Sequence, residues 1–578
     1  MKKRLLLCLT PFILLTACSS NHFYNEIVPE PQSVTKVKDQ TDYAIYSNIT
    51  VDKAPGIYED AIEIKFTNNN PVIDIYYTFD VNYGTGIDSY FKYQGEKIKI
   101  RKPKVESLMD YPITTSVDAI LAWDNLGKCV SNNYISNIQN PKNYKLFPKQ
   151  AVLKVKLVHK ETQKEVLNRS LTYFIEENGL KYYANMPIVS LTMSYDDMYG
   201  PEGFYNAIRD EYKKRCEIEY IDLKYDEYFR VNGQVKLGGN WSTGYPQRTL
   251  NLNFNKDELG KKNDPIKAHI FGDRKAIGLD NKELTNFTRL RLHNGGNCFE
   301  DYTGCNDALI QEVVKETNVS TSAYRPCITY INGEYWGMYA LREHYKQAYF
   351  AQNYGVNKDD VAIVEYKGNW NIDDASDETE ARQLLDSFVA LINSLNFSNQ
   401  SIYEKFCNQY IDIDSFIDII IIHHCAANWD FIGNNNNLKM WRTTKIDENN
   451  KYADGKWRFC MHDCDFAFRE DKNYLSKSQA NNFFIFPLFN KLMQNKSFKN
   501  ALYNRAVELK EDILNYKNIN GILEKMINEV YLYKFDHQTR WGAGNNFMNE
   551  WQGRIDWCKT MIKDRTNKFV NEISAITK

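Results

Sequence analysis

The stretch DIDSFIDIIIIHHCAANWDFIGNNNNLKMW, residues 412–441, decides the fold of the second half of the chain. Its first part predicts a helix capped by Asp412 or Asp414, and because this helix is apolar on almost every side it should be buried. A buried helix that ends in a polar loop delivers Asp430 to a fixed place. The four asparagines that follow are, taken alone, typical of a solvated turn, so their meaning depends on what comes next.

The next long strand is predicted in KWRFCMHDCDFAF, residues 456–468, beyond the short strand LKMW and a polar insertion. Its apolar residues alternate onto one face, as in a strand with one buried side. It ends in two carboxylates, Asp463 and Asp465, which we expect to point into the same cleft as Asp430. The chain thus presents an acidic residue, an amide shortly after it, and carboxylates at the end of a following strand.

Phosphoryl transfer to a hydroxyl needs this set of residues. The reaction uses an acidic residue that orients the acceptor and hard oxygen ligands for one or two Mg²⁺ ions that bridge the nucleotide phosphates. The spacing from Asp430 to Asn435 equals that of the protein-kinase catalytic loop, and DCDF stands where those enzymes have Asp-Phe-Gly. The pattern therefore indicates a nucleotide-dependent phosphotransferase site.

A nucleotide clamp is expected N-terminal to these motifs, in VKLGGNWSTGYPQRTLNLNF. Main-chain N–H groups of Gly238, Gly239 and Asn240 could approach phosphates, with the Ser242 hydroxyl as a further donor and Arg248 as the cation. The alternative for this segment is a β-hairpin turn with an exposed arginine. It is not a Walker loop, because no Gly-Lys-Ser/Thr follows.

Length and charge limit the class of protein. The 578 residues predict two to four domains, and a hydrophobic share of 43% is enough for real cores. The chain has 72 Lys and Arg residues and 74 Asp and Glu residues, and neither the basic nor the acidic residues form a long run. This balance excludes a nucleic-acid-binding tail, so no nucleic-acid partner is expected.

The N-terminus, MKKRLLLCLTPFILLTAC, has a basic start and an apolar stretch that is too short to span a bilayer. We read residues 1–17 as a cleaved signal peptide, and the LTAC ending predicts lipidation of Cys18. Residues 18–49 continue as a polar, proline-bearing tether. The protein is therefore expected to be an exported, membrane-anchored lipoprotein of the cell envelope or surface; the alternative is an ordinary signal peptide with an incidental cysteine.

Ten cysteines follow Cys18, and export permits disulfides. Cys298 and Cys305 are the nearest plausible pair, because they flank a short loop. No pair has the spacing of a zinc knuckle. The residues expected in the core or in disulfides rather than on a metal include Cys460, Cys464, His423 and His424.

Residues 50–178 alternate apolar and polar at period two, which predicts an antiparallel β-sandwich. Residues 186–575 mix helix-like and strand-like segments and end in a long helical tail. The predicted fold is multidomain: the β-sandwich, then a large α+β domain with a helical C-terminal part.

The order of motifs over 186–575 resembles the CotH family, the spore-coat protein H kinases with an atypical protein-kinase-like fold. NGEYWGMYALRE, NWDFIGNNNN and HDCDFAF are the most specific of the segments that carry this resemblance. The β-sandwich segments PGIYEDAIEIKFTNNNPVIDIYYTFD and AVLKVKLVHKETQKEVLNRSLTYFI resemble the immunoglobulin-like C-terminal domain of chitobiases and β-hexosaminidases. Such domains are mostly spacers or accessory binding modules, so no catalysis is assigned to the sandwich.

The CotH resemblance implies roles for the motif residues, with ATP and Mg²⁺ or Mn²⁺ as cofactors. Asp430 would be the catalytic acidic residue, and Asn435 would bind metal, with Asn434 as the alternative because the asparagine run leaves the register open. Asp463, and less directly Asp465, would be the metal-binding carboxylates after the second strand.

Other positions are also implied. Gly333 and Gly337 would form a tight turn and a close approach near the cleft. Glu343 would line the nucleotide pocket or form a surface salt bridge, and Glu312 would pair with the clamp cation. Arg248 stands where the family usually has lysine; an arginine fork is longer and planar, so reduced activity, an altered substrate or a pseudokinase stay open.

Three functions follow. The first is transfer of the ATP γ-phosphoryl to Ser or Thr hydroxyls of another exported protein. The second is a non-catalytic surface module that binds a glycan or an envelope protein, and the third is phosphorylation of an envelope glycan. A glycosidase is not supported, because no motif places two carboxylates as acid and nucleophile.

Overall fold

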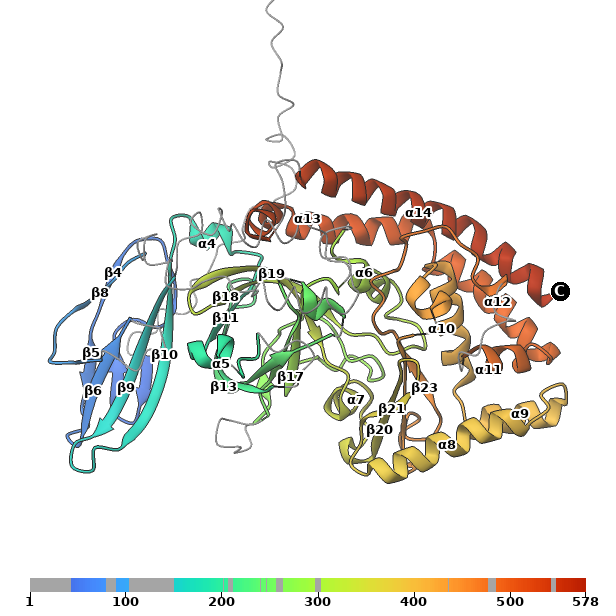
Figure 1. Ribbon diagram of the computed structural model, residues 1–578, viewed down its shortest axis with the longest axis horizontal. Helices are drawn as coiled ribbons and strands as arrows, with labels where there is room; N and C mark the ends of the chain where they lie inside the picture. The colour runs from blue at the N-terminus through green and yellow to red at the C-terminus, as the bar shows by residue number, and fades with distance from the viewer. Residues whose placement is uncertain are drawn as a thin grey trace, which may run out of the picture.

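The computed structural model of the chain describes residues 43–79, 90–102, 150–200, 202–205, 212–239, 241–245, 247–255, 264–296, 303–434, 436–476, 485–541 and 547–578. The predicted signal peptide, Cys18 and the predicted tether as far as residue 42 lie outside these residues, as do Asn240, Cys298 and Asn435. The last part of the predicted tether, residues 43–49, is described and belongs to the first strands of the β-sandwich. Figure 1 shows a β-sandwich, a β-barrel and a mainly helical part along the long axis of the molecule. Within the described ranges, no helix has the length and apolarity to cross a membrane.

The β-sandwich contains one large sheet in the order β3-β10-β9-β6-β7 and two smaller ones, β1-β2-β5 and β4-β8. Neighbouring strands are antiparallel, as expected, except that β3 runs parallel to β10. Buried Leu153, Val155 and Leu157 alternate along β9 and form the core with residues of the other strands. The strands are β1 (Tyr43–Tyr46), β2 (Ile49–Val51), β3 (Gly56–Tyr58), β4 (Ile62–Ile64), β5 (Phe66–Asn68), β6 (Ile73–Thr78), β7 (Phe91–Lys92), β8 (Ile98–Ile100), β9 (Ala151–His159) and β10 (Glu165–Ile175).

A closed barrel follows, in the order β11-β12-β13-β14-β17-β19-β18. All its pairs are antiparallel except β11 with β18, which run parallel. Alternate apolar residues such as Ile218, Leu250 and Leu292 fill its interior. The strands are β11 (Ile188–Thr192), β12 (Lys214–Asp222), β13 (Glu227–Leu237), β14 (Leu250–Asn253), β17 (Arg289–His293), β18 (Tyr324–Ile331) and β19 (Glu334–Glu343).

Short elements complete the barrel region. Helix α6 (Asn306–Val313) lies between β17 and β18 in the chain. The remaining short elements are α4 (Gly179–Tyr182), α5 (Tyr195–Tyr199), η3 (Trp241–Gly244), the ladder of β15 (Ile266–Lys267) with β16 (Asn286–Phe287), α7 (Gln347–Tyr354) and η5 (Lys358–Asp360).

The helical part begins with a small antiparallel sheet in the order β21-β20-β22-β23. Its strands are β20 (Val361–Tyr366), β21 (Trp370–Asp374), β22 (Leu438–Thr443) and β23 (Arg458–Cys460). The long helical tail is also confirmed. The helices are α8 (Glu378–Ser394), α9 (Gln400–Gln409), α10 (Ile413–Cys425), α11 (Ile485–Leu492), α12 (Lys496–Asp512), α13 (Tyr516–Trp541) and α14 (Phe547–Thr577).

Helix α10 is the buried helix that the opening stretch predicts. Every residue from Ser415 to Cys425 is buried, and Asp412 caps the helix by accepting a hydrogen bond from the main-chain N–H of Ser415, 3.1 Å away. The histidine pair at its end is also buried. The helix leads directly into a single π-helical turn, η6 (Trp429–Gly433), which carries Asp430. Such turns are frequent at functional sites.

The strand expected over 456–468 is shorter than predicted, because only β23 pairs with a neighbour. The chain turns away after it, and both Asp463 and Phe468 have positive φ, 53° and 55°. The N–H of Cys464 donates to the Asp307 side chain of α6 rather than to a strand. The carboxylates therefore lie on a turn beyond the strand and not within it.

The sandwich packs against the barrel through buried polar contacts. The main-chain N–H of Ser170 on β10 donates to Glu217 of β12, 2.7 Å away. The hydroxyls of Thr172 on β10 and Ser190 on β11 lie 3.3 Å apart. Buried hydrogen-bonded groups have defined geometry, so these contacts fix the sandwich on the outside of the barrel.

Candidate phosphotransferase site

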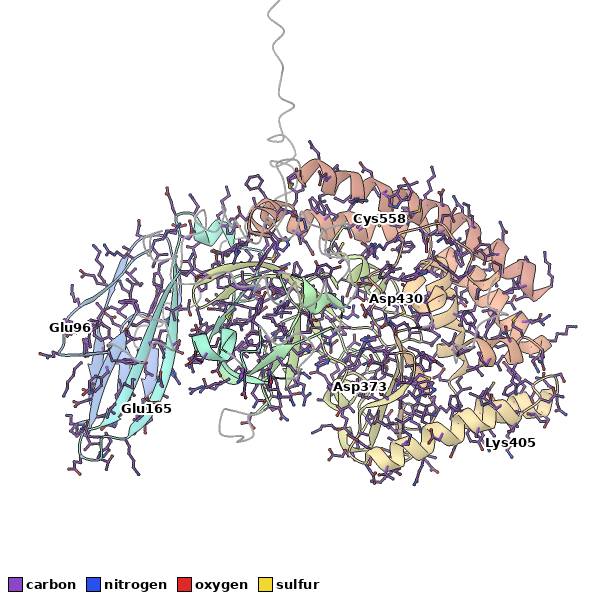
Figure 2. The ribbon with its side chains drawn as sticks, in the orientation of Figure 1. Glu96, Glu165, Asp373, Lys405, Asp430 and Cys558 are labelled. Carbon is purple, nitrogen blue, oxygen red and sulfur yellow. The ribbon has the colours of Figure 1, made fainter. Side chains whose placement is uncertain are left out.

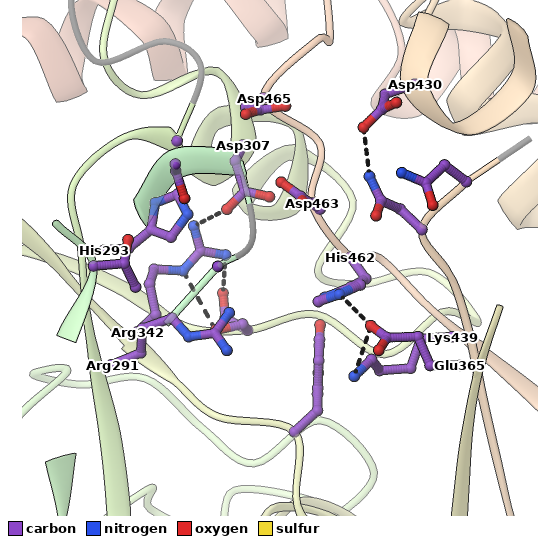
Figure 3. A pocket seen from close by; sticks show the side chains of 18 of the residues that line it. Arg291, His293, Asp307, Arg342, Glu365, Asp430, Lys439, His462, Asp463 and Asp465 are labelled. Atoms are coloured by element: carbon purple, nitrogen blue, oxygen red, sulfur yellow. Dashed lines mark hydrogen bonds and ion pairs between the residues drawn. The ribbon is translucent and has the colours of Figure 1, made fainter. Parts of the chain in front are cut away.

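A cavity of about 690 Å³ lies between the barrel and the helical part. Its wall combines residues of the clamp turn, β17, α6, the end of β19, the small sheet, η6 and the turn after β23. Figure 2 labels Asp430 and Asp373 in this central region. Figure 3 shows Asp430, Asp463 and Asp465 around one part of the cavity, with Arg291 on the barrel side and Lys439 on the other.

Asp430 is held by the asparagine run that follows it. The side-chain amide of Asn434 donates to Oδ1 and that of Asn437 donates to Oδ2, each at 2.7 Å. The main-chain N–H of Asn436 donates to the Asp430 carbonyl, 3.1 Å away. A carboxylate fixed through both oxygens has one orientation, which is what an acceptor-orienting residue needs.

Asp463 is one of several carboxylates that line the cavity. Burial raises the pKa of Asp463 to about 6, and the nearby charges of Asp307 and Asp430 act in the same direction. Crowded carboxylates repel one another until a cation lies between them. The electrostatics of this part of the cavity therefore favour a bound cation.

Asp465 is buried and lies against the barrel. A Cβ on Gly296, whose φ is +59°, would lie 2.5 Å from Asp465 Oδ2. Asn294 holds this glycine turn, because its amide donates to the Gln247 carbonyl at 2.6 Å and its oxygen accepts from the Gly296 N–H at 3.0 Å. The HNGG segment at the end of β17 is thus shaped to let Asp465 reach the cavity.

Asp307 of α6 was not predicted as a site residue. Its carboxylate pairs with Arg342, 2.6 Å away, and accepts from Gln311 and from the Cys464 N–H, at 2.8 and 2.9 Å. Burial opposes ionisation, but the Arg342 charge and these hydrogen bonds hold the pKa of Asp307 far below its usual range. Asp307 therefore anchors the turn that carries Asp463.

The barrel contributes Arg291 to the cavity wall. Its Nε donates to Asn251 Oδ1 at 2.9 Å, and one terminal nitrogen lies 3.2 Å from His344 Nε2, which accepts as a neutral ring. Burial lowers the pKa of Arg291, whereas Asp463 and Asp373 act in the opposite direction. Arg291 is thus a cavity cation placed among acidic groups.

The small sheet supplies a second cation, Lys439. Its ammonium lies 2.8 Å from Asp373 and 3.3 Å from Glu365, and Glu365 also lies 2.8 Å from His462 Nε2. Each of the two carboxylates also pairs with a second lysine: Asp373 lies 3.0 Å from Lys346, and Glu365 lies 3.1 Å from Lys367. Lys439 is therefore oriented by its partners and fixed at the cavity wall.

The clamp turn lies at the cavity, but its arginine does not face it. Gly239, with φ +86°, and Ser242, which the sequence predicts as nucleotide contacts, both line the cavity. Arg248 is fully buried, its guanidinium stacks over the Tyr205 ring at 4.9 Å, and its Nε donates to a carbonyl. Residues alternate sides entering β14, so Thr249 faces the cavity and Arg248 faces away from it. This placement contradicts the expected contact of Arg248 with phosphate.

Two further acidic residues were named from the family resemblance, and Glu312 differs from the expectation whereas Glu343 fits the first of its two alternatives. Glu312 pairs with Arg274, 3.1 Å away, and not with Arg248. Glu343 lines the cavity and forms no surface salt bridge: it accepts from Asn353 and from the Ala323 N–H, and burial raises its pKa to about 7.

Gly333 and Gly337 are structural, as expected, but they do not line this cavity. Gly333 forms the turn between β18 and β19 with φ +80°, where a Cβ would lie 2.5 Å from the Gln150 carbonyl. A Cβ on Gly337 would lie 2.8 Å from both His537 and Trp541 of α13. The close approach is therefore to the C-terminal helices.

The described cysteines other than Cys305 are free thiols, and most of them are buried. The expected partner of Cys305 falls outside the described residues, so that pairing stays a prediction. Burial raises the pKa of the Cys460 thiol to about 12, which keeps it protonated.

The cavity fits a divalent cation held with a nucleotide. Asp430, Asp463 and Asp465 offer hard oxygen donors of the kind that Mg²⁺ prefers. Across the described chain, no three His, Cys, Asp or Glu residues converge closely enough to hold an ion by themselves. Mg²⁺ sites in nucleotide enzymes commonly combine one or two carboxylates with phosphate oxygens and water, which is what this donor set permits.

The barrel carries the glycine turn at Gly239, and α6 carries the buried Asp307. The helical part carries Asp430 and the turn with Asp463 and Asp465. Together these features define a kinase-like domain. A family model described as CotH kinase protein matches residues 235–569, more than half of the chain. The chain therefore belongs to the CotH kinase family, a membership that in general implies ATP and a divalent metal. A search of curated proteins gives no match.

Proposed function

We propose that this protein is a surface lipoprotein whose kinase-like domain transfers the ATP γ-phosphoryl to Ser or Thr hydroxyls of another exported protein. The observation that carries the proposal is the doubly hydrogen-bonded Asp430 in the same cavity as Asp463 and Asp465. An acceptor-orienting carboxylate beside metal-type carboxylates is the arrangement that phosphoryl transfer to a hydroxyl uses.

We assign a separate role to each group of site residues. Asp430 orients the acceptor hydroxyl and accepts its proton. Asp463 and Asp465, with Asn435 or Asn434, would hold Mg²⁺ or Mn²⁺, which supplies charge neutralisation at the phosphates when bound. Other ligands would come from the nucleotide and water.

The barrel and the small sheet would hold the nucleotide. Main-chain groups at Gly239 and the Ser242 hydroxyl face the cavity, and Arg291 and Lys439 supply positive charge there. We assign to Arg291 the phosphate contact that Arg248 is too buried to make. Arg can bind a phosphate through two nitrogens, which would hold the chain of phosphates in one orientation.

The acceptor would enter past Trp429, which precedes Asp430. Its ring is 38% exposed, lines the cavity and lies 5.3 Å from Phe466. A large exposed aromatic group at a reaction centre is a common anchor for a protein partner. Export and lipid attachment at Cys18 would place this opening at the cell envelope.

The experiment uses the chain from Ser19 onward with γ-labelled ATP, Mg²⁺ or Mn²⁺, and envelope extract as acceptor, beside an Asp430→Ala variant. Label on Ser or Thr that disappears with Asp430→Ala supports the proposal. Label on a glycan instead would establish the glycan kinase, and absence of both label and Mg²⁺-dependent nucleotide binding would establish a non-catalytic surface module.

A further inference from the structure

Arg565 of α14 joins three segments that are distant in the sequence. It is fully buried, although guanidinium groups rarely are unless paired. One terminal nitrogen donates to the His424 carbonyl at 3.0 Å, and the other donates to Asp471 Oδ1 at 3.2 Å. Glu572 of the same helix accepts from both nitrogens, at 2.7 and 3.2 Å.

The first of these contacts reaches the segment that carries Asp430. His424 lies in the last turn of α10, immediately before the loop and turn that place Asp430 in the cavity. The His424 ring also lies 3.0 Å from Glu572. Arg565 and Glu572 together therefore fix the end of α10 against α14.

The second contact reaches the segment after Asp463 and Asp465. Asp471 lies between Arg565 and Lys568, and both cations pair with it. The same segment is also tied by Trp557, whose Nε1 donates to the Arg469 carbonyl at 3.1 Å. Helix α14 thus holds the chain directly downstream of both carboxylates.

A main-chain hydrogen bond links the two segments directly. The N–H of Phe468 donates to the Ala426 carbonyl at 2.7 Å. This bond, like the Arg565 contacts, joins the approach to Asp430 with the exit from the carboxylate turn. The separation between Asp430 and Asp463 is therefore set by contacts that lie behind the cavity.

In many protein kinases the segment after the metal-binding aspartate becomes ordered only when a phosphate on it pairs with arginine. Here a carboxylate, Asp471, already lies between Arg565 and Lys568. We propose that Arg565 is a positioning residue which, through Asp471, assembles the catalytic loop and the carboxylate turn without an activating phosphate. The expected change in kcat rests on the proposed function, whereas the expected change in hydrogen exchange does not.

The test compares full chains carrying Arg565→Lys or Asp471→Asn with the parent. Arg565→Lys keeps the charge but cannot reach three partners as a planar fork does. We expect kcat for phosphoryl transfer to fall about 10- to 100-fold, because small displacements of reacting groups have effects of this size. Hydrogen–deuterium exchange of residues 463–471 should rise in both variants.

The control is the pair of Arg505 on α12, which is partly exposed, with the fully buried Asp418 on α10, 2.7 Å apart. It also holds α10 but does not touch the carboxylate turn. Arg505→Lys should lower Tm as much as Arg565→Lys, yet leave kcat and the exchange of residues 463–471 within twofold of the parent.

Equal loss of kcat and equal exchange in the Arg565 and Arg505 variants would show that Arg565 acts only through stability. Loss of parent activity after phosphatase treatment would show that an added phosphate, and not Asp471, assembles the site. If the parent transfers no phosphoryl group, the proposed function fails, and hydrogen exchange still decides the positioning: unchanged exchange in Arg565→Lys contradicts it.

Discussion

The Asn437 side-chain amide donates a 2.7 Å hydrogen bond to Asp430 Oδ2 within the same loop. Asn437 is buried and has φ +59°, a backbone conformation that asparagine adopts more readily than most residues. With Asn434 on the other carboxylate oxygen, the asparagine run fixes the residue that we propose orients the acceptor. The run is therefore part of the site and not merely a solvated turn.

Asn437→Ala should reduce kcat about tenfold, because Asp430 loses one of its two side-chain donors and rotates more freely. A hydrogen bond to a charged group contributes about 1.5–3 kcal/mol, so the free energy of unfolding should also fall. Steady-state kinetics and urea unfolding measure the two effects. Asn449→Ala, in an exposed turn after β22, is the control, and an unchanged kcat for Asn437→Ala would show that Asp430 needs no such support.

Arg291 and Arg248 should respond differently to substitution. Arg291→Ala removes a cavity cation and should weaken binding of a non-hydrolysable ATP analogue with Mg²⁺ at least tenfold, as measured by calorimetry. Arg248→Lys removes a fully buried stack on Tyr205, so it should lower stability by about 1–3 kcal/mol and change nucleotide affinity less than twofold. The opposite pattern of effects would indicate that Arg248, and not Arg291, contacts the phosphates.

The pKa of Asp463, raised to about 6 by burial and neighbouring carboxylates, predicts a pH dependence. The folded protein holds this proton more tightly than the unfolded chain, so the metal-free protein loses stability as pH rises from about 3.8 to above 6. Mg²⁺ requires the ionised carboxylate, so its affinity should rise over the same range.

Asp463→Asn should therefore stabilise the metal-free protein at pH 7.5 by about 1–3 kcal/mol and flatten this part of the pH profile. Urea unfolding in EDTA at pH 5 and 7.5 measures both. A variant no more stable than the parent at pH 7.5 would mean that the ionised Asp463 is not destabilised in the fold.

Gly296→Ala tests the close approach of the barrel to Asp465. The added Cβ would lie 2.5 Å from Asp465 Oδ2, so the carboxylate must move, and Mg²⁺-dependent activity should fall about tenfold or more. Gly368→Ala is the matched control, because Gly368 also has positive φ but no atom within 4 Å of the added Cβ. If both variants lose activity alike, backbone strain and not contact with Asp465 is the cause.

The local part of the site could be predicted from the sequence. Helix α10, its Asp412 cap and the order of Asp430, Asp463 and Asp465 all follow from periodicity and motif spacing along one stretch of chain. The glycine turn at Gly239 was likewise predicted, because two strand patterns flank it.

The parts of the site that depend on tertiary structure could not be predicted from the sequence. Asp307, Arg291 and Lys439 come from three elements that meet only when the barrel packs against the small sheet. The side that Arg248 faces was predicted wrongly, because it depends on one alternation of side chains at the point where the chain enters β14. Periodicity over the two residues before β14 is too short to decide which side Arg248 faces. For Arg291, the RLRLH alternation of β17 was a signal in the sequence.

The most direct test of the role of Asp430 is single-turnover transfer of γ-labelled phosphate by the parent protein and by Asp430→Asn, with Mg²⁺–ATP binding measured for both. We predict that Asp430→Asn binds Mg²⁺–ATP within about threefold of the parent and transfers label at least 100-fold more slowly, because the amide cannot accept the acceptor proton. Equal transfer by both proteins would contradict the role of Asp430 at the centre of this site.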